Sequence, residues 1–219
     1  SKLCSTENMD YIAGKKGRFV TVMPRNRIED AQFRKWIQTN EPQWEQVWDR
    51  RNPRKKHGPR DRWWVFRNPV LSTEARPIIW VHSALLQLKQ DRTRQEHMAA
   101  ALAALGDLKR RLAAPKCRLR KASVVGEKID DILERFDVRR YLKARRTVRH
   151  VHRFVQKRRG RPGPDSDYRR VTRRRWDVEW DVDEAAIAYD RKSDGMYPLL
   201  TNDRNLTPAQ VLIAHKAQP

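Results

Sequence analysis

Four carboxylates recur at every second position in one stretch of the chain, a spacing that could place them together for metal binding. They are Asp177, Glu179, Asp181 and Asp183. Hard divalent cations take oxygen ligands, so this stretch is a candidate cation site. Alternate residues of a strand lie about 6.6–7 Å apart, however, which is wide for ligands of one ion. A solvated sheet face, or pairing with the basic residues 169–175, is the favoured interpretation.

Other residue combinations that commonly do chemistry are weaker here. His150 and His152, with the distant Cys117, make a poor set of zinc ligands. The sequence contains no phosphate-binding glycine loop, no dinucleotide-binding fingerprint and no zinc-protease motif. No Ser-His-Asp arrangement follows from the spacing of these residue types. We therefore assign no catalytic residue and no metal ligand within the chain.

Positive charge is the dominant feature of the composition. The 219 residues carry 49 Lys plus Arg against 27 Asp plus Glu, a formal net charge of +22. Residues 139–175 contain 16 Lys or Arg and only two acids, and residues 50–62 contain seven with one acid. Concentrated basic charge attracts polyanions, and the release of DNA counterions makes that attraction strong and salt-dependent. Nucleic-acid binding is the predicted function, with a solvated face or a basic tail as the alternative.

Arginines are the predicted phosphate contacts, because a guanidinium can bind a phosphate through two hydrogen bonds. The first group lies in the longer basic region and comprises Arg158, Arg159, Arg161, Arg169, Arg170, Arg173, Arg174 and Arg175. The second group lies in the shorter basic segment and comprises Lys55, Lys56 and Arg60.

The elements that must position these residues are predicted from apolar periodicity to form a mixed α/β (α+β) fold. Helices are expected over 3–13, 28–38, 84–114, 123–136, 138–155 and from Thr207, where Pro208 takes the first helical position. Strands are expected over 18–23, 44–48, 63–67, 78–83, 169–175, 176–182 and 196–201. The Gly- and Pro-rich residues 160–164 interrupt the pattern and mark a boundary.

Two compositional features indicate the cellular compartment of the protein. The longest apolar stretch, Met98 to Leu105, is far shorter than the roughly 20 residues of a membrane helix, so no membrane partner is expected. Cys4 and Cys117 are too few for a disulfide framework, which favours a reducing compartment. An intracellular location is therefore expected, and the resemblance described in the next paragraph implies the bacterial cytoplasm, in association with the nucleoid.

Several segments resemble bacterial insertion-sequence transposases of the DDE type. They are residues 1–5 (SKLCS), 17–24 (GRFVTVMP), 160–168 (GRPGPDSDY), 194–203 (DGMYPLLTND) and 206–212 (LTPAQVL). The resemblance is closest to the branch whose last catalytic acid lies in a Tyr-x2-Arg-x3-Glu-x6-Lys signature. His215 takes the Tyr place of that signature and Gln218 takes the Arg place, while the Glu would fall just beyond Pro219.

The resemblance implies a ribonuclease H-like core in which two Asp and one Glu bind two Mg²⁺ for cutting and joining transposon ends. It places the second Asp directly before Ser1, so the chain is expected to be the piece between that Asp and the Glu. The expected parts are a core helix and strand over 1–23, an insertion over 24–206 with long helices over about 84–155 and strands over 168–201, and the start of the last core helix over 207–219.

The resemblance also implies that this segment grips transposon-end DNA, binds no Mg²⁺ by itself and is inactive alone. The full-length parent would be the Mg²⁺-dependent enzyme, and it could act as a homodimer. A catalytically dead remnant that regulates transposition, and a basic structural RNA-binding protein, remain as alternatives. The strand over 18–23 is expected to lack its core neighbours and to expose an apolar edge.

Overall fold

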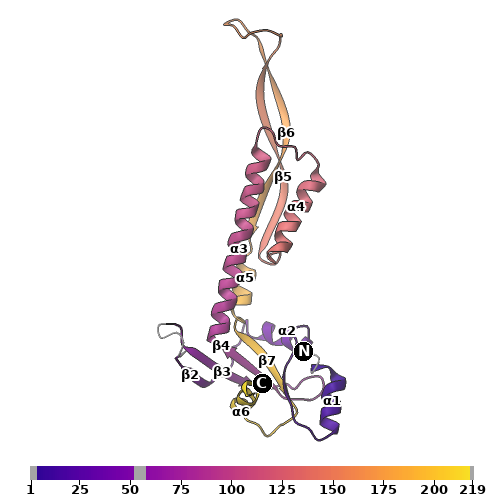
Figure 1. Ribbon diagram of the computed structural model, residues 1–219, viewed down its shortest axis with the longest axis vertical. Helices are drawn as coiled ribbons and strands as arrows, with labels where there is room; N and C mark the ends of the chain where they lie inside the picture. The colour runs from indigo at the N-terminus through magenta and orange to yellow at the C-terminus, as the bar shows by residue number, and fades with distance from the viewer. Residues whose placement is uncertain (1–3, 52–57, 218–219) are drawn as a thin grey trace. The chain divides into compact units, whose positions relative to one another are not determined.

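The computed structural model describes residues 4–51 and 58–217, which form a mixed α/β protein with antiparallel sheets (Figure 1). The described helices are α1 (Thr6–Gly14), α2 (Ile28–Trp36), α3 (Ala84–Ala113), α4 (Ala122–Arg135), α5 (Glu184–Arg191) and α6 (Pro208–Lys216). The described strands are β1 (Val20–Val22), β2 (Glu45–Arg50), β3 (Asp61–Arg67), β4 (Ile78–Ser83), β5 (Leu142–Gln156), β6 (Tyr168–Val182) and β7 (Met196–Thr201).

The chain divides into two compact units. Unit 1 comprises Ser1–Thr93 and Ala188–Pro219, and unit 2 comprises Arg94–Ile187. The divisions fall within α3 and within α5. The boundaries after residues 23 and 206 that the family resemblance implies stay a prediction.

Unit 1 is built on a five-stranded antiparallel sheet with the order β1-β7-β4-β3-β2. The strand expected without neighbours, β1, pairs with β7, and Val20 stands opposite Thr201. The partner of β1 therefore comes from the far end of the chain, which sequence reasoning did not anticipate. In the described sheet, β1 is still an edge strand, and Val22 is 37% exposed.

Helices cover both faces of this sheet. Alternate residues of β4 point to opposite faces and pack against different helices. Trp80 packs with Met9 and Phe33 on the face covered by α1 and α2, and its ring stacks on that of Phe33 at 3.7 Å between centroids. Val81 packs with Leu212 on the face covered by α6. The start of α6 agrees with the sequence: the Thr207 side chain accepts from the backbone N–H of Gln210 in a capping box.

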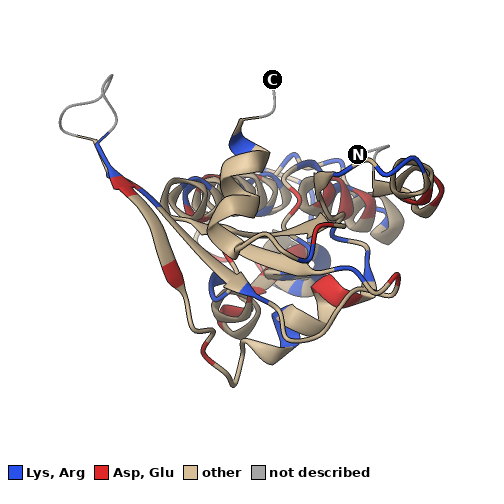
Figure 2. Ribbon diagram, turned by 90° about the horizontal axis from the view of Figure 1, so that it is seen from below, with Lys and Arg blue, Asp and Glu red and all other residues tan. Residues whose placement is uncertain are grey.

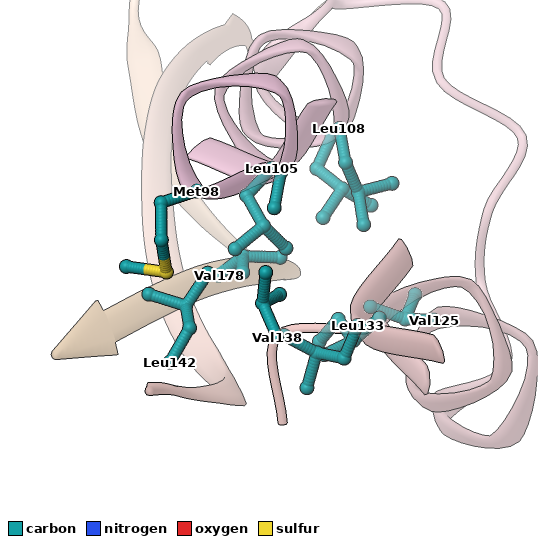
Figure 3. Close-up of a cluster of buried hydrophobic side chains, with 11 residues drawn as sticks. Met98, Leu105, Leu108, Val125, Leu133, Val138, Leu142 and Val178 are labelled. Carbon is teal, nitrogen blue, oxygen red and sulfur yellow. The ribbon is translucent and has the colours of Figure 1, made fainter. Parts of the chain in front are cut away.

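Unit 2 has its own core between α3, α4 and the antiparallel pair β5–β6. Leu105 and Leu108 point from α3 toward this core, where they meet Leu133 of α4 and Val178 of β6 (Figure 3). Leu105 and Val178 are completely buried. The leucines of α3 thus pack against the elements that follow this helix in the chain.

The helix predicted over 138–155 is wrong, because most of this segment is strand β5. Its apolar residues Val148, Val151 and Val155 recur at spacings of three and four, which imitate a helix. The alternation of apolar and polar residues that is typical of a strand is not visible here. The distal half of the segment is exposed on both faces and carries polar residues on each. Pairing with β6 along the whole of its length overrides the local pattern.

Candidate nucleic-acid interface

The basic region forms a two-stranded antiparallel ribbon. β5 and β6 are each 15 residues long and pair without a register shift, from Leu142 opposite Val182 to Gln156 opposite Tyr168. The breaker 160–164 lies in the connection between them. A Gly- and Pro-rich breaker between two basic runs is a hairpin signal, and it could have identified the ribbon from the sequence.

The half of the ribbon nearest the helices, Leu142–Val148 with Trp176–Val182, is here called the proximal ribbon. One face of it is apolar and contributes Leu142, Val178 and Trp180 to the core of unit 2. This confirms that the alternation of Trp, Val and carboxylates places the aromatic residues on one face.

Charges on the proximal ribbon are balanced. It carries three basic residues and three acidic residues. Arg145 lies 3.3 Å from the carboxylate of Glu179 and 3.7 Å from that of Asp181. Asp177 lies 3.9 Å from the ammonium of Lys109 on α3. The acidic face is therefore paired mainly with β5 and α3, whereas residues 169–175 belong to the same strand as the acids.

The other half, Arg149–Gln156 with Tyr168–Arg175 and the connection 157–167, is here called the distal ribbon. It projects beyond α3 and α4 (Figure 1). Residues 149–175 contain eleven Lys or Arg and two acids. Of the two acids, Asp167 lies 3.4 Å from Lys157. Positive charge on the distal ribbon is therefore largely uncompensated.

Most of these arginines extend into solvent. Within the part of the chain that the structure describes, the side chains of eight exposed arginines form neither an ion pair nor a hydrogen bond: Arg149, Arg153, Arg158, Arg159, Arg161, Arg169, Arg173 and Arg174. Six of the eight were predicted as phosphate contacts. Arg149 and Arg153 were missed because the sequence pattern of their segment predicts a helix.

Two predicted arginines have other contacts. Arg170 donates from Nη2 to Nε2 of His152 at 2.7 Å, and Nδ1 of the same ring lies 2.8 Å from the Thr172 hydroxyl. Arg175 donates to the carbonyl oxygens of Ala114 and Pro115 at the end of α3. Arg175 therefore caps the end of α3, and its role as a phosphate contact stays a prediction.

The histidines of β5 do not form the weak zinc set with Cys117. Both ring nitrogens of His152 are engaged, and Cys117 packs against the core of unit 2. Among the described residues, no three His, Cys, Asp or Glu side chains are grouped closely enough to hold a metal ion.

Two arginines of the second basic segment are paired with acidic residues. Arg60 forms an ion pair with Asp49, and Arg50 lies 3.4 Å from Asp61. Figure 2 shows basic and acidic residues together on this β2–β3 hairpin. Lys55 and Lys56 lie outside the described residues.

The remnant of the expected signature helix lies in unit 1. His215 is on α6, with its ring centroid 6.1 Å from that of Tyr197. Its Nδ1 is buried without a partner among the described residues. Burial, with a smaller contribution from Lys216, lowers the pKa of His215. Gln218 lies outside the described residues.

Comparison with known proteins identifies no relative of this chain. No protein-family model, no curated protein and no solved structure matches the chain. No described helix combines the length and the apolar character needed to cross a membrane.

Proposed function

We propose that this chain is a DNA-binding segment of a DDE transposase and that it holds DNA through the distal ribbon. The observation that carries the DNA-binding part is the division of charge along one ribbon. Charges are balanced where the ribbon packs and unbalanced where it projects. A polyanion site requires positive charge that is not already paired with acids, and the distal ribbon provides it. A surface that is only solvated would not require such a division of charge.

The electrostatic part of DNA binding can be measured from the dependence of affinity on salt concentration. Each phosphate neutralised on B-DNA contributes about −0.9 to the slope of log affinity against log salt. The eight arginines without partners among the described residues set an upper limit of about −7 for their share of the slope. Binding should therefore weaken by orders of magnitude between low and moderate salt.

The transposase part of the proposal rests on the sequence resemblance. It assigns β1 and α6 to a ribonuclease H-like core, with α6 as the helix that would continue toward the catalytic Glu. In the parent enzyme, bound Mg²⁺ would supply the phosphodiester chemistry, and its ligands are placed outside this chain. The flanking codons test this part: an Asp codon directly before Ser1 and a Glu codon just after Pro219 are expected, and other codons there would contradict it.

The binding experiment measures affinity for a labelled DNA duplex over a salt series. The double variant Arg149→Ala with Arg173→Ala should reduce the magnitude of the slope by about 1.8. The matched control is Arg145→Ala, which removes a charge from the same ribbon but one that already pairs with two carboxylates. An unchanged slope in the double variant would contradict the assignment of the distal ribbon.

The same reactions test catalysis and the nature of the nucleic acid. We expect binding without Mg²⁺-dependent nicking of transposon-end DNA. Nicking that persists through purification would show that the catalytic acids are misplaced, and Asp177 to Asp194 would be the first region to examine. Tighter binding of folded RNA than of duplex DNA would favour the structural RNA-binding alternative.

A further inference from the structure

The distal ribbon has two different faces, because paired residues of β5 and β6 share a face and successive residues alternate. One face, here called the arginine face, carries Arg149, Arg153, Arg169, Arg173 and Arg175, with Val151, Val155 and Val171 between them. The opposite face carries His150, His152, Phe154, Gln156, Tyr168, Arg170, Thr172 and Arg174.

Four of these five arginines follow a zigzag across the two strands, while the fifth, Arg175, stands opposite Arg149 and donates to the end of α3. Arg173 is the diagonal neighbour of both Arg149 and Arg153, and Arg153 is the diagonal neighbour of Arg169. Diagonal neighbours on an antiparallel pair lie about 7–8 Å apart, within a Debye length of about 8 Å at physiological salt. Their mutual repulsion favours the binding of an anion along this face.

The two faces continue differently toward the helices. On the opposite face, the ribbon continues into residues that pack under α3 and α4, such as Ala144 and Val178. The Trp176 indole there donates to the carbonyl oxygen of Arg120. On the arginine face, the ribbon continues into Asp177 and Glu179, whose carboxylates repel phosphate and limit the length of a bound duplex.

The dimensions of the ribbon favour one groove of DNA. Two paired strands lie about 4.8 Å apart, and a two-stranded ribbon fits the major groove of undistorted B-DNA, which is about 12 Å wide, whereas the minor groove is only about 6 Å wide. The eight paired positions of the distal ribbon extend about 23 Å, or about seven base pairs.

We infer that the distal ribbon enters the major groove of duplex DNA with its arginine face toward the base edges. This inference rests on the proposed function and adds the groove, the face and the bases that are read. Arginine binds the O6 and N7 acceptors of guanine through two hydrogen bonds. Arg153 and Arg169, near the middle and the tip of the face, are assigned to guanines, and Arg149 and Arg173 to phosphates.

Two base-analogue substitutions in a short GC-rich duplex test which groove the ribbon enters. Replacing every guanine with 7-deazaguanine removes N7 from the major groove, whereas replacing it with inosine removes the amino group from the minor groove. Neither changes the charge of the DNA. We expect 7-deazaguanine to weaken binding about fivefold or more for each arginine–guanine pair that it disrupts, and inosine to have little effect.

Lysine substitutions test the face. The double variant Arg153→Lys with Arg169→Lys keeps the charge and therefore the salt slope, but lysine cannot form the two parallel hydrogen bonds of a guanidinium. This variant should therefore be less sensitive to 7-deazaguanine than the unsubstituted protein. Arg170→Lys on the opposite face is the matched control and should keep that sensitivity. A purely electrostatic role would leave the response to 7-deazaguanine the same in all three proteins and would overturn the inference.

The remaining outcomes separate the inference from the proposed function. Weaker binding to inosine DNA with no effect of 7-deazaguanine would move the ribbon to the minor groove and overturn the inference, while DNA binding would stand. Equal affinity for the RNA duplex of the same sequence would also overturn it, because the A-form major groove is deep and narrow. Absence of duplex binding would overturn the proposed function itself.

Discussion

The guanidinium of Arg175 donates to the carbonyl oxygen of Ala114 at 2.6 Å and so caps the last turn of α3. The carbonyl groups at a helix C-terminus lack partners within the helix and carry partial negative charge. Arg175 also donates to the carbonyl oxygen of Pro115 at 2.9 Å. One arginine of the basic run therefore joins the ribbon to the end of the helix, while its neighbours Arg173 and Arg174 extend into solvent.

Two substitutions within this run should therefore affect different properties, stability in one case and DNA binding in the other. Arg175→Ala should lower the free energy of unfolding of unit 2 by about 1–2 kcal/mol, because it removes two charge-assisted hydrogen bonds. Arg173→Ala should leave stability unchanged and reduce the magnitude of the salt slope by about 0.9. Denaturant unfolding and DNA binding, measured on both variants, check the pair. Equal effects of the two substitutions on both quantities would contradict the distinction.

The acids of the proximal ribbon should restrain DNA binding. Glu179 lies 3.3 Å from Arg145, and both side chains are about half or more exposed to solvent, at 49% and 66%. Glu179→Gln should leave Arg145 with less compensation, raise DNA affinity and increase the magnitude of the salt slope by up to about 0.9. Glu134→Gln on the exposed surface of α4 makes the same charge change away from the ribbon and is the control. A similar gain in both variants would show that only net charge matters.

The sequence predicted most of the elements because their local signals agree with their tertiary setting. The alternation of Trp176, Val178 and Trp180 indicated a strand with one apolar face, and these residues do face the core of unit 2. The leucines of α3 indicated a long helix, and Pro115 follows its end. In each case one face is buried, so the period of the pattern is visible.

The sequence could not predict what depends on distant partners. The distal ribbon buries neither face fully, so its period of two is obscured, and the pattern of β5 imitates a helix. The partner of β1 lies about 180 residues along the chain, at Thr201. The cap made by Arg175 depends on where α3 ends in space, so composition alone grouped this residue with the phosphate contacts.

The turn before β7 makes a sharp prediction for stability. Gly195 has a φ of 77°, and an added Cβ would lie 2.6 Å from the carbonyl oxygen of Ser83. Its own N–H donates to Oε1 of Gln90. Gly195→Ala should therefore destabilise unit 1 by about 2–4 kcal/mol through backbone strain and collision. Thermal or denaturant unfolding measures the loss.

The control for this variant is Gly14→Ala in α1. An added Cβ at Gly14 meets no atom within 4 Å. Alanine loses less conformational freedom in a helix than glycine, so Gly14→Ala should be neutral or stabilising by up to about 1 kcal/mol. A similar stability of the two variants would contradict the strained geometry at Gly195.

The last prediction concerns Glu29, whose side chain joins α2 to the loop before β4. Its Oε1 accepts from the backbone N–H of Thr73 at 2.8 Å and lies 3.3 Å from Nη2 of Arg27. Burial alone would raise the pKa of Glu29, but hydrogen bonds from Thr73 and Arg27 outweigh burial and lower this pKa from 4.5 to about 2. The folded protein therefore favours the ionised form more than the unfolded chain does.

The sign of the pH dependence follows from that lowered pKa. The stabilisation by Glu29 should be complete above pH 4.5 and lost as the pH falls toward 2, because the unfolded chain binds the proton first. Glu29→Gln should cost about 1–3 kcal/mol near neutral pH and flatten the acid part of the stability profile. Glu7→Gln, an exposed position on α1, is the control. An acid profile that is as steep in Glu29→Gln as in the unsubstituted chain would show that other carboxylates, such as Glu74, control it.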